Sequence, residues 1–242
     1  MSNARIELLK TQGRALVTGA SRGIGHAVAT KLAALGFRVV ALGRRFEPAA
    51  FPGCGDVETV VYDLAGCEGL ADLVAGLGPI SVLINNAGVM HPNTWRDYPQ
   101  ETRARSLKVN LVAPVELMRL VAPGMLAAGG GSIVNVASIA GYIGHPDVWY
   151  GATKAGLLNA TKSFALQLGA GGVTVNAVAP GPVETDMLAV IPPERQAMLR
   201  NGAVSKRFST ADEVAEAALS MAFGPVQVTG ATLDICAGAV LR

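Results

Sequence analysis

Residues 15–25 read Ala15-Leu16-Val17-Thr18-Gly19-Ala20-Ser21-Arg22-Gly23-Ile24-Gly25, a short apolar run followed at once by three glycines. The apolar run predicts a buried strand, and the residues from 23 onward predict the start of a helix. Glycines at this spacing allow a tight turn, close approach of backbone to a pyrophosphate, and close packing of helix on strand. The N–H groups and positive dipole end of a helix N-terminus also attract phosphate. The segment therefore predicts a dinucleotide-binding turn, with contacts from Gly19, Ser21, Arg22, Gly23, Ile24 and Gly25, although an ordinary glycine turn could read similarly.

Further short apolar runs alternate with longer amphipathic stretches along the chain. Seven runs are continuously apolar and rich in Val and Ile, near 15–18, 38–42, 57–62, 80–84, 132–137, 173–178 and 232–235. Such runs are typical of parallel strands that are covered on both faces. Helical patterns lie between them, near 23–35, 67–77, 101–127, 150–169 and 211–223. The alternation predicts an α/β protein with one doubly wound, seven-stranded parallel sheet flanked by helices.

Composition and charge argue against several classes of function. The 242 residues carry 20 Lys+Arg against 18 Asp+Glu, and no basic run is present to bind nucleic acid. The longest apolar region, residues 111–128, contains Glu116 and Arg119, so we expect no membrane span, and the N-terminus has no apolar signal region. The three cysteines have no metal-ligand spacing. We therefore expect a cytoplasmic protein with free thiols, no metal, and no nucleic-acid or membrane partner.

Two arginines stand at the end of the second apolar run. In a sheet of this kind that point reaches the adenosine ribose, where NAD-selective proteins place an acidic residue against the 2′-hydroxyl. Here Arg44 and Arg45 follow the strand, and no acidic residue comes before Glu47. Guanidinium groups suit a phosphate dianion, and Arg22 could close on the same phosphate. We therefore expect NADP rather than NAD, although two arginines in a solvated turn would read the same way.

Tyr150 and Lys154 lie four residues apart in a predicted helix, which places both on one face. A cation within about 4–6 Å lowers the pKa of a phenol from about 10 towards neutrality, as general acid–base catalysis requires. Ser138 ends the fifth apolar run, so its hydroxyl could bind the same substrate oxygen. Each residue alone has an ordinary structural explanation, but their joint order behind the right strands predicts a catalytic group.

In combination these residues make the sequence resemble the short-chain dehydrogenase/reductase family from about Gly13 to the C-terminus. Within this family, the sequence most resembles the 3-oxoacyl-carrier-protein reductase branch. The matching segments are the glycine turn 18–25, Asp63-Leu64, Asn85-Asn86-Ala87-Gly88, Asn110, Ser138, Tyr150 with Lys154, and 180–185.

The resemblance implies a single NADP-binding Rossmann domain over residues 1–242 that interconverts ketones and secondary alcohols. It implies that Tyr150 exchanges a proton with the substrate oxygen, Lys154 binds the nicotinamide ribose, and Ser138 orients the substrate. Asn110 is expected at a helix kink, holding a water behind Lys154. The remaining cofactor contacts are expected from Asp63 and Leu64 at the adenine, Asn86, Ala87 and Gly88 along the adenosine, and Pro180, Gly181, Val183 and Thr185 at the nicotinamide end.

The sequence constrains the substrate and the oligomeric state less than it constrains the fold and the cofactor site. Residues 184–208 form a long, partly apolar segment at the mouth of the site, which predicts a substrate lid, with a packed surface helix as the alternative. A reductase that binds an acidic carrier protein is expected to present basic residues. The flanking segments 121–131 and 165–172 contain no Lys or Arg. We therefore expect a ketoreductase for small-molecule carbonyls or alcohols, with 3-oxoacyl-carrier-protein reductase as the alternative.

A regulator that binds NADP without catalysis is an alternative of another class, and the intact Tyr150, Lys154 and Ser138 argue against it. The resemblance implies a tetramer in which the last strand lies at a subunit interface. Cys236 and Ala237 stand where the family usually has Asp-Gly-Gly. We expect a homotetramer or a homodimer.

Overall fold

The sheet of the protein is doubly wound, and its strand order creates one crevice. The computed structural model describes residues 1–240. Seven parallel strands pair in the order β3-β2-β1-β4-β5-β6-β7. Their bounds are β1 Arg14–Thr18, β2 Val39–Gly43, β3 Val57–Val61, β4 Ile80–Asn85, β5 Gly131–Val136, β6 Val173–Pro180 and β7 Thr232–Ile235. The predicted fold class is confirmed, and the order reverses between β1 and β4, where ligands bind in open sheets.

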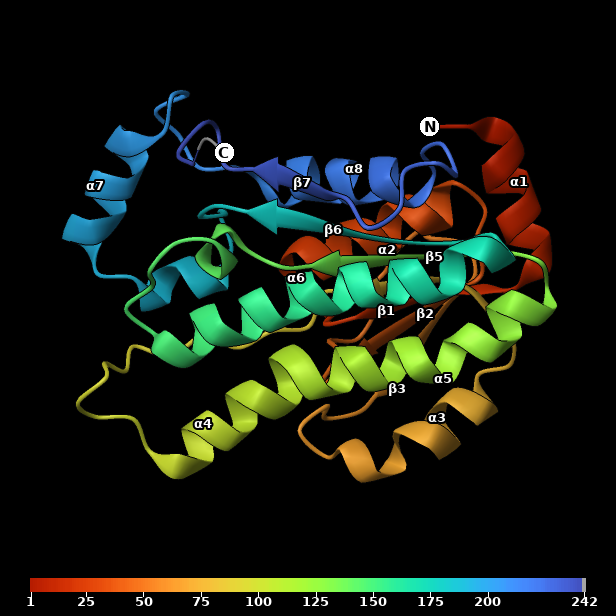
Figure 1. Ribbon diagram of the computed structural model, residues 1–242, viewed down its shortest axis with the longest axis horizontal. Coiled ribbons are helices and arrows are strands. Elements are labelled where there is room, and N and C mark those ends of the chain that lie inside the picture. Colours follow the sequence, from red (N-terminus) through yellow and green to blue (C-terminus); the bar gives the residue numbers. More distant parts are fainter. Residues whose placement is uncertain (241–242) are drawn as a thin grey trace.

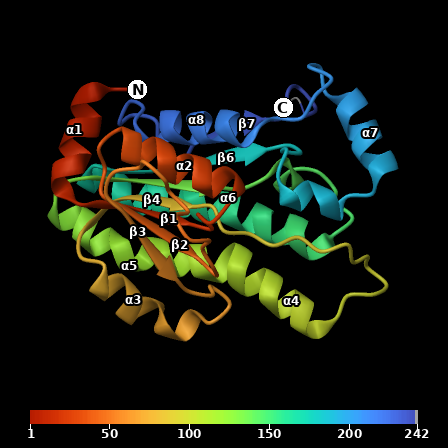
Figure 2. The ribbon, with the colours of Figure 1, turned by 180° about the vertical axis from the view of Figure 1, so that it is seen from behind.

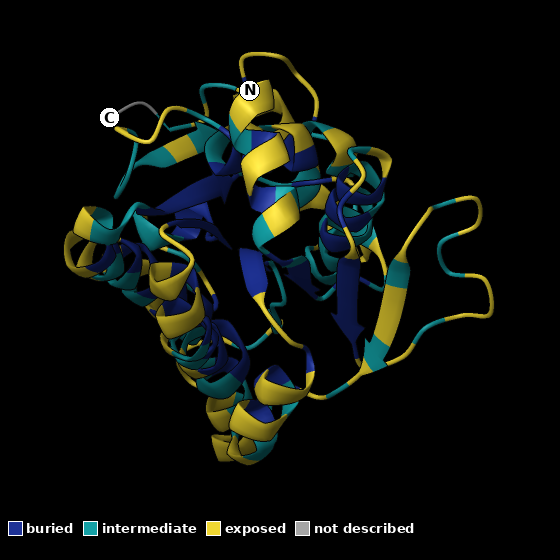
Figure 3. Ribbon diagram, turned by 90° about the vertical axis from the view of Figure 1, so that its right-hand side faces the viewer, coloured by how far each residue is buried: buried dark blue, intermediate teal, exposed yellow. Residues whose placement is uncertain are grey.

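Helices cover both faces of this sheet. On one face lie α1 Asn3–Gln12, α2 Gly23–Ala34 and α8 Ala211–Ala222, and on the other α3 Leu70–Gly76, α5 Ala113–Ala127 and α6 Val148–Leu168 (Figures 1 and 2). Successive side chains of β1 enter different cores, since Val17 packs with the α2 and α8 side chains and Leu16 with those of α5. This explains the continuously apolar runs, and Figure 3 shows buried central strands inside helices with exposed outer faces.

Three parts of the fold differ from the sequence expectation. The edge strand β3 has exposed positions, with Val61 68% exposed, because no strand pairs with its outer side. The predicted 101–127 helix consists of α4 Gln100–Leu107, a π-helical turn Lys108–Val112, and α5. The helix α1 was not predicted, because it is short and mostly polar, and α7 Pro193–Gly202 lies in the segment 184–208, where a surface helix was only the alternative to a lid.

The stretch Gln100–Ala127 is long and apolar enough to cross a membrane by length and composition, and half of its most apolar window is buried in the domain. Leu117 and Met118 of α5 are fully buried in the core beneath the sheet. Burial of this kind is what a core helix of a globular domain shows. All three cysteines are free, and residues 1–240 contain no cluster of His, Cys, Asp or Glu that could hold a metal.

Candidate active site

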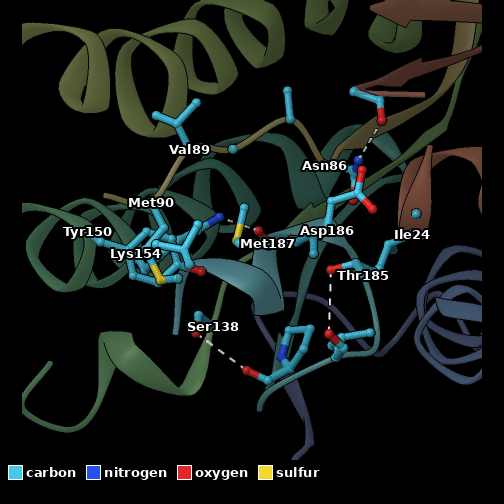
Figure 4. Close-up of a pocket in the computed structure, with 18 of the residues that line it drawn as sticks. Ile24, Asn86, Val89, Met90, Ser138, Tyr150, Lys154, Thr185, Asp186 and Met187 are labelled. Carbon is cyan, nitrogen blue, oxygen red and sulfur yellow. Dashed lines mark hydrogen bonds between the residues drawn. The ribbon is translucent and has the colours of Figure 1, made fainter. Parts of the chain in front are cut away.

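A cavity of about 700 Å³ opens at the carboxyl ends of the strands. Its walls come from the segments that follow β1, β2, β3, β4, β5 and β6, together with the start of α6. Figure 4 shows Tyr150, Lys154 and Met90 at one end of it and Ile24, Asn86 and Asp186 at the other. Every predicted site residue except Gly25, Arg45 and Asn110 lines this cavity.

The glycine turn is built for close backbone approach. Gly19 has φ +66°, and a Cβ there would lie 2.8 Å from the Cα of Ala87. The side-chain amide of Asn86 donates to the carbonyl oxygens of Thr18 (2.9 Å) and Gly19 (3.2 Å). A Cβ at Gly25 would lie 2.4 Å from that same amide nitrogen, so Gly25 serves the packing behind the turn rather than the cavity wall. A turn without side chains at these positions has the form that lets a backbone approach a phosphate closely.

The two arginines after β2 differ in their position relative to the cavity. Arg44 lines the cavity, and among residues 1–240 no carboxylate lies within 4 Å of it. Arg45 is exposed and lies outside the cavity, because the chain leaves the wall after Arg44. Arg22 lines the cavity but pairs at 2.6 Å with Asp186, a carboxylate of the segment after β6. In this structure Arg44 is therefore a guanidinium on the cavity wall without a carboxylate partner among residues 1–240, while Arg22 pairs with Asp186.

Asp63 and Leu64 line the same end of the cavity. Burial acts to raise the pKa of Asp63, but hydrogen bonds from the Ala65 N–H and from Arg105 outweigh it, so the pKa is lowered. The carboxylate is therefore ionised at neutral pH and remains a hydrogen-bond acceptor.

Tyr150, Lys154 and Ser138 meet at the opposite end. Lys154 is buried, its Nζ donates to the carbonyl of Val136 at 2.8 Å, and it lies 5.7 Å from the centre of the Tyr150 ring. The Ser138 hydroxyl accepts from the Ala140 N–H at 3.1 Å and donates to the Pro180 carbonyl at 3.4 Å. Ser138 comes from the segment after β5 and the other two side chains from α6, and the three lie together at this end of the cavity.

The pKa values of this group differ from expectation. Burial raises the pKa of Tyr150, while its hydrogen bond with Ser138 acts in the opposite direction. Burial also lowers the pKa of Lys154 to about 8. The expected lowering of the phenol pKa by Lys154 was therefore wrong for this state of the protein, because desolvation of the phenol is the larger effect.

Asn110 lies in the π-helical turn, which is the predicted kink. Its amide nitrogen donates to the Val89 carbonyl at 2.8 Å and to Thr153 Oγ1 at 3.3 Å, and its oxygen accepts from the Val89 N–H at 2.8 Å. These bonds fix the segment after β4, beside Gly88 and Lys154. Asn110 does not line the cavity, so we describe it as a positioning residue rather than a catalytic one.

Pro180, Gly181, Val183 and Thr185 line the cavity where β6 ends. The methyl group of Thr185 would lie 3.2 Å from a Cβ at Gly23, so this segment closes against the glycine turn. A 3-10 turn Asp186–Val190 and then α7 continue the wall through Leu188, Ile191 and Leu199.

Residues 13–196 match the family model described as short chain dehydrogenase. The chain belongs to this family. It is 32% identical to the 3-oxoacyl-(acyl-carrier-protein) reductase FabG of Pseudomonas aeruginosa, covering 95% of this chain and 98% of that protein.

Two solved structures share this dehydrogenase fold. A proposed NAD(P)-dependent gluconate 5-dehydrogenase of Beutenbergia cavernae, with NADP bound at low occupancy, superposes with a TM-score of 0.88 at 32% identity and covers 96% of this chain and 98% of its own. A proposed 2-deoxy-D-gluconate 3-dehydrogenase of Agrobacterium tumefaciens, with bound NADP, gives 0.89 at 30% identity and coverage of 97% and 99%.

The cavity of this dehydrogenase fits NADP. A side-chain-free turn at Gly19, packed against Ala87 and lining the cavity, together with Arg44, suits a dinucleotide with a 2′-phosphate. The dehydrogenase is an NADP(H)-dependent oxidoreductase acting on a ketone or secondary alcohol of a small molecule. When bound, the nicotinamide supplies or accepts the hydride.

One buried residue of the dehydrogenase site was not predicted from the sequence. Asp147 is 1% exposed and begins α6, where its carboxylate accepts from the Tyr150 N–H (2.9 Å), the His91 N–H (2.9 Å) and the Tyr98 hydroxyl (2.8 Å). Burial first, and then the hydrogen bond to Asp147 and its charge, raise the pKa of Tyr98 to about 12 against the opposite effect of the hydrogen bond with Ser106, so Tyr98 stays a donor. The sequence signal is an Asp three residues before Tyr150, in a helix N-cap position.

Proposed function

We propose that Tyr150 is the general acid and base of this dehydrogenase. In reduction the Tyr150 hydroxyl donates its proton to the substrate oxygen, and in oxidation it takes that proton back. Ser138 holds the same oxygen through its hydroxyl. The buried Lys154 binds the ribose next to the nicotinamide and moves a proton to Tyr150. The observation that carries this assignment is that these three side chains meet at one end of a cavity whose other end bears Arg44.

We infer that the remaining wall residues contact the cofactor as the family resemblance implies. Asp63 and Leu64 face the adenine, and Asn86, Ala87 and Gly88 run along the adenosine. Residues 180–185 hold the nicotinamide end. The segment 184–208 acts as a lid over the substrate, supported by the absence of buried residues in α7 among those described and by its apolar side chains on the cavity wall.

A small free ketone or alcohol is the substrate that we favour over a carrier-bound acyl thioester. Segments 121–131 and 165–172 offer no basic residue to an acidic carrier protein. The 32% identity to FabG keeps 3-oxoacyl-carrier-protein reduction as the second candidate.

We also propose that the dehydrogenase works in the cytoplasm as a homotetramer or homodimer. Leu166 of α6 is 87% exposed, and Leu126 of α5 is exposed on a neighbouring helix. Exposed apolar side chains on adjacent helices favour contact with a second copy.

The decisive experiment follows NADPH oxidation by absorbance with a panel of ketones, diketones and acyl thioesters. Wild-type protein should turn over at least one ketone, and Tyr150→Phe should lose turnover by about 100-fold or more while binding NADPH normally. The neighbouring Trp149→Phe variant is the matched control. Tight NADPH binding with no turnover of any compound would instead support a regulator.

The carrier-protein alternative needs a separate comparison. The same acyl group is offered as its carrier-protein thioester and as a small thioester. Carrier-bound substrate with a kcat/KM far above that of every free ketone would overturn our choice of substrate.

A further inference from the structure

Arg195 is a cation on the cavity wall that has no role in the reaction proposed above. It is the third residue of α7, it is half-buried, and its side chain lines the cavity. Among residues 1–240 no carboxylate lies within 4 Å of its guanidinium. An arginine in this position retains all its donors for another partner.

Arg195 lies on the side of the cavity where the chemistry occurs. Its charge acts on His145, whose ring centre is 5.2 Å from that of Tyr150. Burial first, and the charge of Arg195 in addition, lower the pKa of His145, so this imidazole is neutral at pH 7. Figure 1 shows α7 beyond the arrowheads of β5 and β6, on the side where α6 begins. A ligand held by Tyr150 can therefore extend past His145 towards Arg195.

Two of the three carboxylates on the cavity wall form ion pairs with arginines other than Arg195. Asp186 pairs with Arg22, and Asp63 pairs with Arg105. Glu184 is exposed, and its charge acts on Arg207 outside the cavity. The lining residues close to Arg195 in the sequence include the apolar Leu188, Ile191 and Leu199.

The first turn of α7 is joined to the turn that precedes it within the segment 184–208. The Gln196 side-chain amide donates to the carbonyl oxygens of Leu188 (3.1 Å) and Ile191 (2.8 Å), which ties α7 to the 3-10 turn before it. Arg195 is thus carried by a helix whose position relative to Leu188 and Ile191 is fixed, and fewer freedoms are lost when such a donor binds a ligand against these residues.

We propose that Arg195 binds a carboxylate of the substrate, so that the physiological substrate is an oxo acid or hydroxy acid. The acid group lies at the end remote from the carbonyl that Tyr150 protonates. A guanidinium matches a carboxylate with two parallel hydrogen bonds, and a single cation suits a monoanion. This inference rests on the proposed function of Tyr150, and it adds the chemical class of the substrate.

The test compares oxo acids with neutral analogues of the same shape. The series CH₃–CO–(CH₂)ₙ–COO⁻, with n from 1 to 4, is assayed with NADPH beside the corresponding primary amides. The wild-type enzyme should prefer the best acid over its amide by about 10- to 100-fold in kcat/KM. Arg195→Gln should remove that preference while leaving the amides nearly unchanged, and a phosphate ester of a hydroxyketone should remain a poor substrate.

Arg200→Gln is the matched control, because it removes the same charge from the same helix. Arg200 lies outside the cavity, with its guanidinium 4.8 Å from the centre of the Phe208 ring. This variant should retain the wild-type preference. Equal use of acids and amides by the wild-type enzyme, or an unchanged preference in Arg195→Gln, would overturn the inference while leaving the ketoreductase assignment intact. A clear preference for the phosphate ester would overturn the choice of carboxylate.

A binding measurement separates failure of the inference from failure of the proposed function. Hexanoate and hexanamide, which cannot be reduced, are titrated calorimetrically into the protein saturated with NADP⁺. Hexanoate should bind more tightly than hexanamide, and Arg195→Gln should remove the difference. If no ketone is turned over, this titration still decides whether Arg195 binds carboxylates, because equal binding of the two ligands refutes it.

Discussion

Replacing Asp147 by Ala removes the acceptor on which three donors of different chain segments converge. Two of these donors are the backbone N–H groups of His91 and Tyr150, and the third is the hydroxyl of Tyr98. The variant deletes the N-cap of α6 and leaves the donors in a region where water has little access, since Asp147 is fully buried.

The magnitude follows from these contacts. Loss of an N-cap costs about 1 kcal/mol, and each buried donor left without a partner costs about 1–3 kcal/mol unless water reaches it. We expect Asp147→Ala to lower the free energy of unfolding by about 3–5 kcal/mol. For a chain of this size that corresponds to a fall in Tm of about 6–20 °C.

Asp147→Asn distinguishes the two carboxylate oxygens. Oδ1 accepts from both Tyr150 and Tyr98, while Oδ2 accepts only from His91. If the side-chain amide of Asp147→Asn keeps its oxygen in the place of Oδ1, its NH₂ group takes the place of Oδ2. Only the His91 N–H then faces a donor instead of an acceptor. The loss of stability should then be about 1–3 kcal/mol, smaller than for the alanine variant.

The assay is urea denaturation at pH 7, followed by circular dichroism, with the exposed Glu101→Ala as the control for loss of one acidic side chain. Tyr98→Phe completes a double-mutant cycle. Alone it should cost about 1–3 kcal/mol, and in the Asp147→Ala background it should cost almost nothing. Additive effects, or an Asp147→Ala variant as stable as Glu101→Ala, would refute the network. The KM of the alanine variant should also rise, because His91 lines the cavity.

Three further outcomes are expected. Lys154→Met should abolish turnover. Because the wild-type Lys154 binds fewer protons when folded than when unfolded between pH 8 and 10.5, the stability of wild type relative to this variant should rise by about 2–3 kcal/mol from pH 7 to pH 10 in denaturant titrations. Arg44→Asp should shift the NADPH:NADH ratio of kcat/KM towards NADH by about 10- to 100-fold, whereas Arg45→Asp, outside the cavity, should leave it near the wild-type value. Ala237→Gly should raise Tm by about 2 °C in a thermal scan, because Ala237 has φ 49°, and an unchanged Tm would contradict strain at that residue.

The sequence was sufficient for the parts of the structure that rest on local pattern. The run 15–25 predicts β1, its turn and the start of α2, because periodicity and glycine spacing act over a few residues. Tyr150 and Lys154 could be paired because helical geometry fixes residues four apart. The kink at Asn110 came through family resemblance, and its hydrogen bonds to Val89 became visible only in three dimensions.

Features that depend on contacts across the fold were not predictable from pattern. Arg22 and Asp186 are 164 residues apart in the chain, and nothing local indicates that they pair. The direction of the Tyr150 pKa was missed because burial, which decides it, is a property of the folded chain. Arg195 reads as a surface charge on a polar helix, and only its place on the cavity wall distinguishes it from Arg200.

The segment after β4 shows why the irregular elements of this fold matter for its chemistry. Residues 86–99 contain no helix or strand, yet Met90 and His91 line the cavity. Two buried side chains from different helical elements hold their backbone: Asn110 binds Val89 through both its amide atoms, and Asp147 binds the His91 N–H. A helix without the extra residue of the π turn would rotate the positions on one side of the turn by about 100° relative to the other. Asn110 would then lose its alignment with Val89, so the π turn and the N-cap of α6 together determine the shape of the substrate end.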